Sequence, residues 1–190
     1  MVHAIVDAKR QWLFEKLHHQ QKYQIRPHPP GKEVVNGESA PYLGREYRIE
    51  IADTVSGEIE FSRRFLVPAT HQSKRREVLR GWYIARANEK ILPRVEQRAR
   101  ELGVKFAAAK IVDNRYRWGS CTVNDNVCFN WRLIKAPMFV IDYVIVHELA
   151  HLIESNHTSK FWSIIRANSP TMAKAKTWLK ESGQVLEQEL

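Results

Sequence analysis

Two histidines and a glutamate stand close together in the segment His147-Glu148-Leu149-Ala150-His151. Residues four apart on an α-helix lie on one face about one turn apart, so the two histidines can direct their imidazoles at a single metal ion. A hydrolytic zinc ion is held by three protein ligands and keeps a fourth position for water, whose pKa it lowers to about 7. The HExxH spacing therefore predicts a zinc site in which Glu148 is the general base.

A third ligand is needed, and Glu154 and His157 follow a short way along the chain. Glu154 shares the helix face of the histidines, but in a continuous helix it lies about one further turn along the axis, a long reach for a bond of about 2 Å. His157 requires the helix to end first, and Ser155-Asn156 predicts that end because Asn tolerates the left-handed conformation. We therefore expect a site for one Zn2+ ion or another divalent metal. The predicted ligands are His147, His151 and His157.

The helix that carries this motif is predicted to be buried. Apolar residues occupy nearly all of its faces: Val140, Ile141, Val144, Ile145, Leu149, Leu152 and Ile153. Imidazoles and a carboxylate buried in such a helix need partners that offset their desolvation, and a metal ion supplies them. The alternative, a chance HExxH on a solvated helix face, predicts a polar helix instead.

Composition is that of a globular chain. With 190 residues, 44% of them hydrophobic, it is long enough for one substantial core or for a core with a smaller subdomain. Residues 1–7 lack the basic and apolar regions of a signal peptide, and no apolar run reaches transmembrane length, so we expect a cytoplasmic protein without a membrane partner. The only cysteines, Cys121 and Cys128, do not indicate a disulfide framework.

The formal net charge of +9 points to an anionic partner. Most of the excess lies between Lys74 and Arg117, where Lys and Arg outnumber Asp and Glu by 13 to 5. This region is a candidate for binding nucleic acid or a nucleotide, although a solvated helix face accounts for the charges equally well. The sequence predicts no oligomeric state.

Residues 1–72 are predicted to form a β-rich N-terminal subdomain without recognisable chemistry, after a short helix within 5–22. Apolar and charged residues alternate over 47–51 and again over 58–61, with a Ser-Gly turn between the two runs. This pattern predicts a β-hairpin, and the apolar segment 65–67 predicts a further strand.

Apolar residues recur at helical spacing from about residue 73 to Leu102, and Gly103 follows as a terminator. They predict one long helix, in which Pro93 introduces a kink or separates two abutting helices. A strand over 106–112 is expected next.

The segment 127–133 alternates apolar and polar residues and follows the turn sequence Asn124-Asp125-Asn126. It predicts a hairpin that leads directly into the metal-site helix. Beyond His157, two further helices are expected to pack under the site.

Four motifs in order resemble the YgjP-like metallopeptidase family and look related to the SprT and WLM zincins. They are Arg117-Trp118-Gly119-Ser120-Cys121, Phe129-Asn130-Trp131-Arg132-Leu133, the HExxH segment, and Asn156-His157 with Phe161-Trp162. The resemblance covers roughly residues 74–182. It implies an α+β, zincin-like domain over 73–190, in which the HExxH helix lies under a small, mainly antiparallel sheet. It also implies zinc on the three histidines, with Glu148 as general base.

The leading hypothesis is a zinc-dependent metallopeptidase. Zincins generally pair an extended substrate with an edge strand, and 127–133 is our candidate for that edge. We name Arg117, Asn130 and Arg132 as candidate substrate contacts. Asn130 and Arg132 could equally well be residues on the solvent face of a strand that do not contact a substrate. Tyr116, Tyr143 or an arginine could stabilise the oxyanion.

Two alternatives remain open. A metal-dependent nucleoside triphosphate pyrophosphatase would use Arg115, Arg117 and Arg132 to bind phosphate oxygens, although the chain has no Walker-type loop. A nucleic-acid-associated protein would recruit the site to DNA, or would hold a purely structural zinc, which requires a fourth protein ligand.

Overall fold

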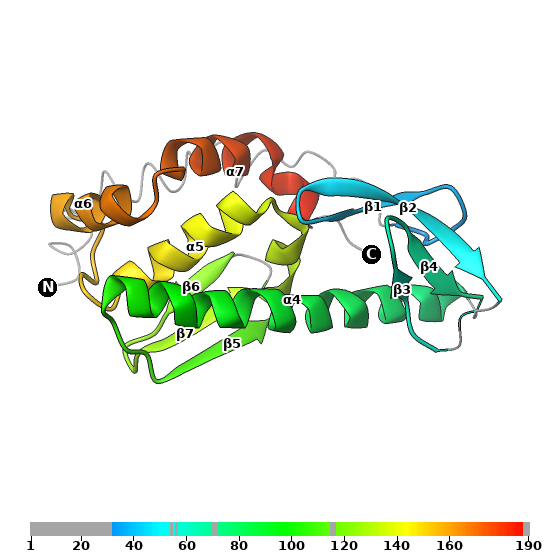
Figure 1. The fold of residues 1–190 in the computed structure, drawn as a ribbon, viewed down its shortest axis with the longest axis horizontal. Coiled ribbons are helices and arrows are strands. Elements are labelled where there is room, and N and C mark those ends of the chain that lie inside the picture. The colour runs from blue at the N-terminus through cyan, green and yellow to red at the C-terminus, as the bar shows by residue number, and fades with distance from the viewer. Residues whose placement is uncertain (1–31, 54, 56, 70–71, 115–116, 188–190) are drawn as a thin grey trace, which may run out of the picture. The chain divides into compact units, whose positions relative to one another are not determined.

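A computed structural model of the chain describes residues 32–53, 55, 57–69, 72–114 and 117–187 (Figure 1). The helix predicted within residues 5–22 lies outside these ranges. The described chain has an α+β fold with two small mixed sheets. No helix among the described residues has the length and hydropathy needed to cross a membrane.

The first sheet has the strand order β1-β2-β4-β3. Its strands are β1 (Ser39–Tyr42), β2 (Arg45–Ala52), β3 (Glu60–Phe61) and β4 (Phe65–Pro68). β1 and β2 are antiparallel and joined by Leu43 and Gly44, which both have positive φ, as a tight hairpin turn requires.

The predicted hairpin between residues 47–51 and 58–61 is wrong. β2 pairs with β1 and, in parallel, with β4, whereas β3 pairs only with β4 among the described residues. The side chains of Phe65 and Val67 in β4 are fully buried, so this strand takes a central place and leaves the two-residue β3 at the edge. Alternation identified the strands but not their partners.

Helix α4 (Gln72–Leu102) runs without interruption through Pro93, which confirms the long helix and excludes two abutting ones. Gly103 ends it with φ +68°, and the N–H of Val104 donates to the carbonyl of Ala99 at 3.0 Å. The buried side chains of α4 follow helical spacing: Leu79, Tyr83, Ala87, Ile91, Val95 and Ala99. Along this face α4 contacts both β4 and β5, one from each sheet (Figure 1).

The second sheet has the order β5-β7-β6. Its strands are β5 (Ala108–Val112), β6 (Gly119–Cys121) and β7 (Asn126–Asn130). β6 and β7 form the predicted hairpin, with Asp125 at φ 56° in its turn. β5 and β7, however, are parallel, so this sheet is mixed and not mainly antiparallel.

The position of β7 corrects two further predictions. β7 lies in the centre of its sheet, between β5 and β6, so 127–133 is not an edge strand. After β5 the chain forms β6 at the other edge and then returns to form β7 between the two. The strand also stops at Asn130, and a 3-10 helix, η1 (Trp131–Lys135), follows. The Asn130 side chain caps η1 by accepting a hydrogen bond from the N–H of Arg132.

Three helices complete the described chain: α5 (Met138–Ala150), α6 (Ser159–Asn168) and α7 (Met172–Glu187). α5 contacts β6 and β7 as well as α4, α6 and α7 (Figure 1). Nine of its side chains are buried, in agreement with its nearly uniform apolar sequence. Asp142 of α5 accepts two hydrogen bonds of 2.7 Å from Arg94, which ties α5 to α4.

Candidate metal centre

The metal-site motif lies at the C-terminal end of α5. His147 and Glu148 belong to the last turn, and His151 is the C-cap residue. The N–H groups of Leu152 and Ile153 then donate to carbonyls three residues earlier, a tighter turn than the α-helix makes.

The helix therefore ends earlier than predicted. The expected end was Ser155-Asn156, with Asn156 left-handed, but Asn156 is not among the described residues with positive φ. The α-helix stops at Ala150 instead. The turn after it leaves enough chain for His157 to return to the two helical histidines.

The three predicted ligands converge. One ligand atom from each of His147, His151 and His157 lies within 4.8 Å of the others, and the Nε2 atoms of His147 and His157 are 3.1 Å apart. Two nitrogens bound to one tetrahedral zinc at about 2.0–2.1 Å lie about 3.4 Å from each other, so the histidines fit such an ion. Glu154 is outside the cluster, and its carboxylate lies 3.9 Å from the Lys160 ammonium.

The surroundings of His147 and of His151 favour metal binding by both rings. Burial lowers the pKa of His147 to about 3, with smaller contributions from His151, His157 and Lys176, so this imidazole stays neutral. The Nδ1 atom of His151 lies 3.3 Å from the backbone carbonyl of Glu154. An Nδ1–H that donates there leaves the His151 Nε2 lone pair free for the metal.

Aromatic side chains of α6 pack against the cluster. Phe161 is fully buried, stacks on His151 at 4.6 Å between ring centroids, and meets His147 and His157 edge-on. Phe161 is therefore a core residue. Trp162 is partly buried and stacks on His157 at 5.7 Å.

Glu148 lies between α5 and β6, with only 8% of its surface exposed. A Cβ atom on Gly119 would lie 2.5 Å from Glu148 Cγ and 2.8 Å from Oε1. Burial raises the pKa of the Glu148 carboxyl to about 7, opposed by Arg117 and by a hydrogen bond from the backbone of Cys121. A carboxyl group with a pKa near 7 can take up and return a proton at neutral pH.

Gly119 is the site residue that the sequence reasoning missed. The Arg117-to-Cys121 motif contained it, but no role was predicted for the glycine. A glycine in a strand often marks a close approach by another group, and that signal was present. Here the approaching group is the side chain of Glu148.

Asn130 and Arg132 are both engaged within the protein. Asn130 is 1% exposed, and its Nδ2 donates to the carbonyls of Asn114 and Arg117, the latter at 3.2 Å. Arg132 pairs with Asp113 and lies 4.4 Å from the Trp131 ring centroid. These contacts tie Asn130 to Asn114 and Arg117, and Arg132 to Asp113. Substrate contact by either side chain stays a prediction.

The other named candidates lie in different surroundings. Arg117 is exposed and acts electrostatically on Glu148. Tyr143 is 6% exposed, and its ring centroid lies 6.0 Å from that of His147. Arg115 and Tyr116 lie outside the described residues.

Much of the basic charge between residues 74 and 117 is paired. Among the described residues of this region, ion pairs with carboxylates are formed by Arg80, Arg86, Lys90, Arg94 and Arg98. Fewer charges are therefore available to an anionic partner than the sequence count suggests. Binding of nucleic acid by this region stays a prediction.

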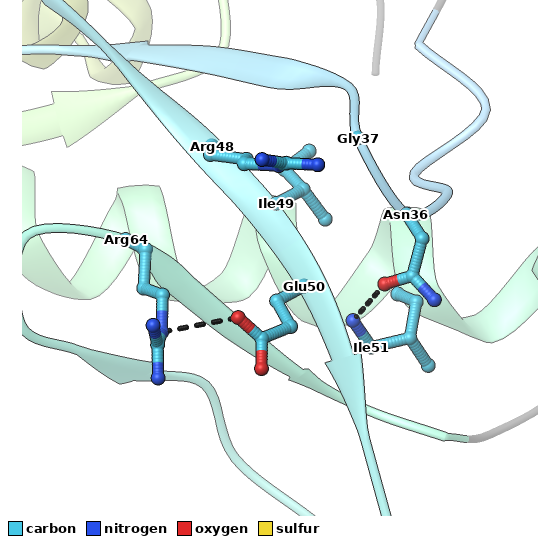
Figure 2. Close-up of a pocket in the computed structure, with 7 residues that line it drawn as sticks. All are labelled: Asn36, Gly37, Arg48, Ile49, Glu50, Ile51 and Arg64. Atoms are coloured by element: carbon cyan, nitrogen blue, oxygen red, sulfur yellow. Dashed lines mark hydrogen bonds and ion pairs between the residues drawn. The ribbon is translucent and has the colours of Figure 1, made fainter.

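An open hollow of about 550 Å³ lies apart from the metal centre, on the first sheet (Figure 2). It is lined by Asn36, Gly37, Arg48, Ile49, Glu50, Ile51 and Arg64. Within it, Arg64 pairs with Glu50 at 3.1 Å, and Asn36 accepts a hydrogen bond from the N–H of Ile51. The hollow contains no histidine of the cluster.

Comparison with known proteins agrees with the motifs. The sequence model described as YgjP-like, metallopeptidase domain, matches residues 1–182. The crystal structure of the metallopeptidase zymogen of Pyrococcus abyssi abylysin is similar to 46% of this chain and 90% of its own, at 18% identity and a TM-score of 0.38. A search of curated proteins finds no match. Because the family match spans most of the sequence, the chain belongs to the YgjP-like metallopeptidase family.

Proposed function

We propose that this protein is a zinc-dependent peptidase in which Glu148 is the general base. The observation that carries the proposal is the convergence of three histidine ligand atoms within 4.8 Å of one another, beside the buried Glu148 carboxylate of α5. Three nitrogen ligands leave a fourth position open, which is typical of catalytic zinc sites rather than structural ones. Membership of a metallopeptidase family supports the same assignment.

His147, His151 and His157 would hold the zinc ion, which would polarise the scissile carbonyl and acidify a water molecule. Glu148 would accept a proton from the attacking water as the water oxygen bonds to the carbonyl carbon. The carboxyl group then donates the proton to the amide nitrogen as the C–N bond breaks, so that no net proton is consumed by the protein. A pKa of about 7 for Glu148 suits both transfers at neutral pH.

β6 replaces β7 as the proposed substrate-binding edge. β6 pairs with β7 on one side and has no strand on its other side among the described residues. Gly119, its first residue, touches the Glu148 side chain, so a peptide paired with the free edge of β6 would pass the general base. Backbone pairing of this kind binds extended peptides with little dependence on their side chains.

The test compares the wild-type protein with Glu148→Gln on a peptide library, after metal content is measured. Glutamine keeps the size of the side chain but cannot act as a base, so we expect turnover to fall by about 10²–10⁴-fold with zinc still bound. Glu154→Gln is the matched control, because Glu154 lies a few residues after α5 and its carboxylate is outside the histidine cluster. Equal turnover by Glu148→Gln and wild type would contradict the proposed mechanism.

Hydrolysis of a nucleoside triphosphate is a second candidate, favoured by the cations beside the site. Arg117 acts on Glu148, and Lys176 acts on His147. Guanidinium and ammonium groups in these positions suit phosphate oxygens. The same variants would be assayed on a nucleotide panel, where loss of turnover in Glu148→Gln together with a raised KM in Arg117→Ala would favour this class over peptides.

A further inference from the structure

His157 differs from the other two histidines in how its position is determined. His147 lies in α5 and His151 caps it, so the helix backbone orients both rings. His157 is exposed and belongs to the segment between α5 and α6, outside any helix. A metal ligand in such a segment needs neighbouring side chains to hold its ring, because metal affinity depends on the orientation of each ligand before binding.

We propose that Trp162 is the positioning residue for His157, and that it determines the metal affinity of the site; this rests on the histidine cluster of the proposed function. The two rings are stacked, with an interplanar angle of 28° and 5.7 Å between centroids. Trp162 meets His147 at a larger angle, 61°, and a longer distance, 6.1 Å. Its face is therefore directed at the ligand that no helix orients.

Phe161 has a different part in the site. Its ring touches all three histidines and is fully buried, so its removal would disturb the whole cluster and the core beneath it. Trp162 is only partly buried, and it stacks on the exposed His157. Substitution of Trp162 can thus change the freedom of His157 with less damage to the fold.

Trp162 is itself held by two helices. α6 follows His157 directly after its N-cap residue, Thr158, whose hydroxyl accepts a hydrogen bond from the backbone N–H of Phe161. The backbone N–H of Trp162 donates to the Thr158 carbonyl at 3.1 Å. From α7, the Lys176 ammonium lies 4.7 Å from the centroid of the Trp162 ring. Cation–π contact of this kind restrains the ring, so α6 and α7 together orient the surface on which His157 stacks.

The experiment measures zinc affinity by competition with a chromophoric chelator, in full-length protein and without any substrate. We expect Trp162→Ala to weaken zinc binding by about 10–100-fold, the usual effect of losing a group that orients a metal ligand. Trp162→Phe keeps an aromatic face and should restore most of the affinity. Far-UV circular dichroism and the thermal midpoint show that each variant is folded at the assay temperature.

Two controls separate positioning from general packing. Trp178 of α7 is also a partly buried tryptophan packed against the core, so Trp178→Ala should lower the thermal midpoint but leave zinc affinity unchanged. In a His157→Ala background, Trp162→Ala should cause no further loss, because Trp162 acts through His157. Unchanged affinity in Trp162→Ala, or an equal loss with and without His157, would overturn the inference.

Failure of this inference is distinguishable from failure of the proposed function. If Trp162→Ala weakens zinc binding while no peptide is cleaved, the positioning role holds and the peptidase assignment falls. If Trp162→Ala binds zinc normally while Glu148→Gln abolishes peptide cleavage, only the positioning role falls. A wild-type protein that binds no zinc would overturn both.

Discussion

Gly119 of β6 and Glu148 of α5 pack so closely that a Cβ atom at position 119 would lie 2.5 Å from Glu148 Cγ. Real Cβ contacts are not this short, so any larger residue must displace the carboxylate or the strand. Glu148, the proposed base, thus lies directly against β6, the proposed substrate-binding edge. The contact also explains why position 119 is a glycine. The φ of Gly119 does not require a glycine, so the reason is the lack of room for a side chain.

Gly119→Ala is therefore expected to reduce turnover by about 10²-fold, since a displacement of about 1 Å at a catalytic group has effects of that size. Zinc affinity should be retained, because the three atoms nearest to a Cβ at position 119 all belong to Glu148. Steady-state kinetics and metal analysis on the same preparation test this. Turnover equal to wild type would show that the site tolerates the extra methyl group.

Gly81 is the matched control for Gly119. It lies within α4, and a Cβ atom there would meet no atom within 4 Å. Gly81→Ala should leave turnover unchanged and stabilise the protein by about 0.5–1 kcal/mol through helix propensity. Urea denaturation measures the change, and a loss of stability would contradict the open space around this residue.

The dependence of activity on pH should report the ionisation of Glu148. Its pKa is raised to about 7, and only the carboxylate form can accept the proton of water. Turnover should therefore fall about tenfold per pH unit below the pKa of this carboxyl group, which the charge of bound zinc lowers from its metal-free value, with the plateau above it. His147, with a pKa lowered to about 3, does not account for a loss near pH 7. A pH–rate profile with no acidic limb, in protein that keeps its zinc, would contradict this role.

Buried Lys135 should make stability rise with pH. It is 2% exposed, and burial lowers its pKa to about 7 from an ordinary 10.5. Between these values the unfolded chain binds more protons than the folded one, so the free energy of unfolding increases with pH, by at most about 1.4 kcal/mol per unit. Lys135 still has partners, including the Leu186 carbonyl at 3.4 Å and the Tyr83 and Trp131 rings.

Lys135→Met tests this expectation. Methionine keeps a similar length without a charge, so the variant should be more stable at pH 7 and should lose the slope between pH 7 and 10. Lys160→Met is the control, because 68% of the Lys160 side chain is exposed. Urea denaturation at several pH values measures all three proteins, and parallel curves for wild type and Lys135→Met would refute the prediction.

Zinc should raise the thermal midpoint of the wild-type protein. At a free concentration 100 times its Kd, a ligand that binds only the folded state adds about 2.7 kcal/mol, or about 5–10 °C for a chain of this size. His157→Ala should lose most of this shift, since it removes one of three ligand atoms.

Glu154→Ala should keep the zinc-induced shift, because its carboxylate lies outside the cluster. Differential scanning calorimetry with and without zinc, at one protein concentration, compares the three proteins. The reverse pattern, with the shift lost in Glu154→Ala and kept in His157→Ala, would assign the third ligand to Glu154.

The features that the sequence predicted correctly depend on near neighbours along the chain. Helical spacing ending at Gly103 predicted α4, the turn around Asp125 predicted the β6–β7 hairpin, and the four-residue spacing of His147 and His151 placed both on one helix face. Each of these follows from the period of a regular backbone, which a short window of sequence contains.

Tertiary structure alone decided the rest. Alternation identified β2 and β7 as strands, but it did not identify their parallel partners, β4 and β5. Which strands pair depends on which of them lie in the centre of a sheet, and the packing of the whole core determines that. At the site, the sequence predicted His157 as the third ligand, but it did not predict that α5 ends at Ala150 or that Glu148 contacts Gly119 across two elements. Contacts between residues distant in sequence leave no periodic signal, so only the packed structure brings these side chains together.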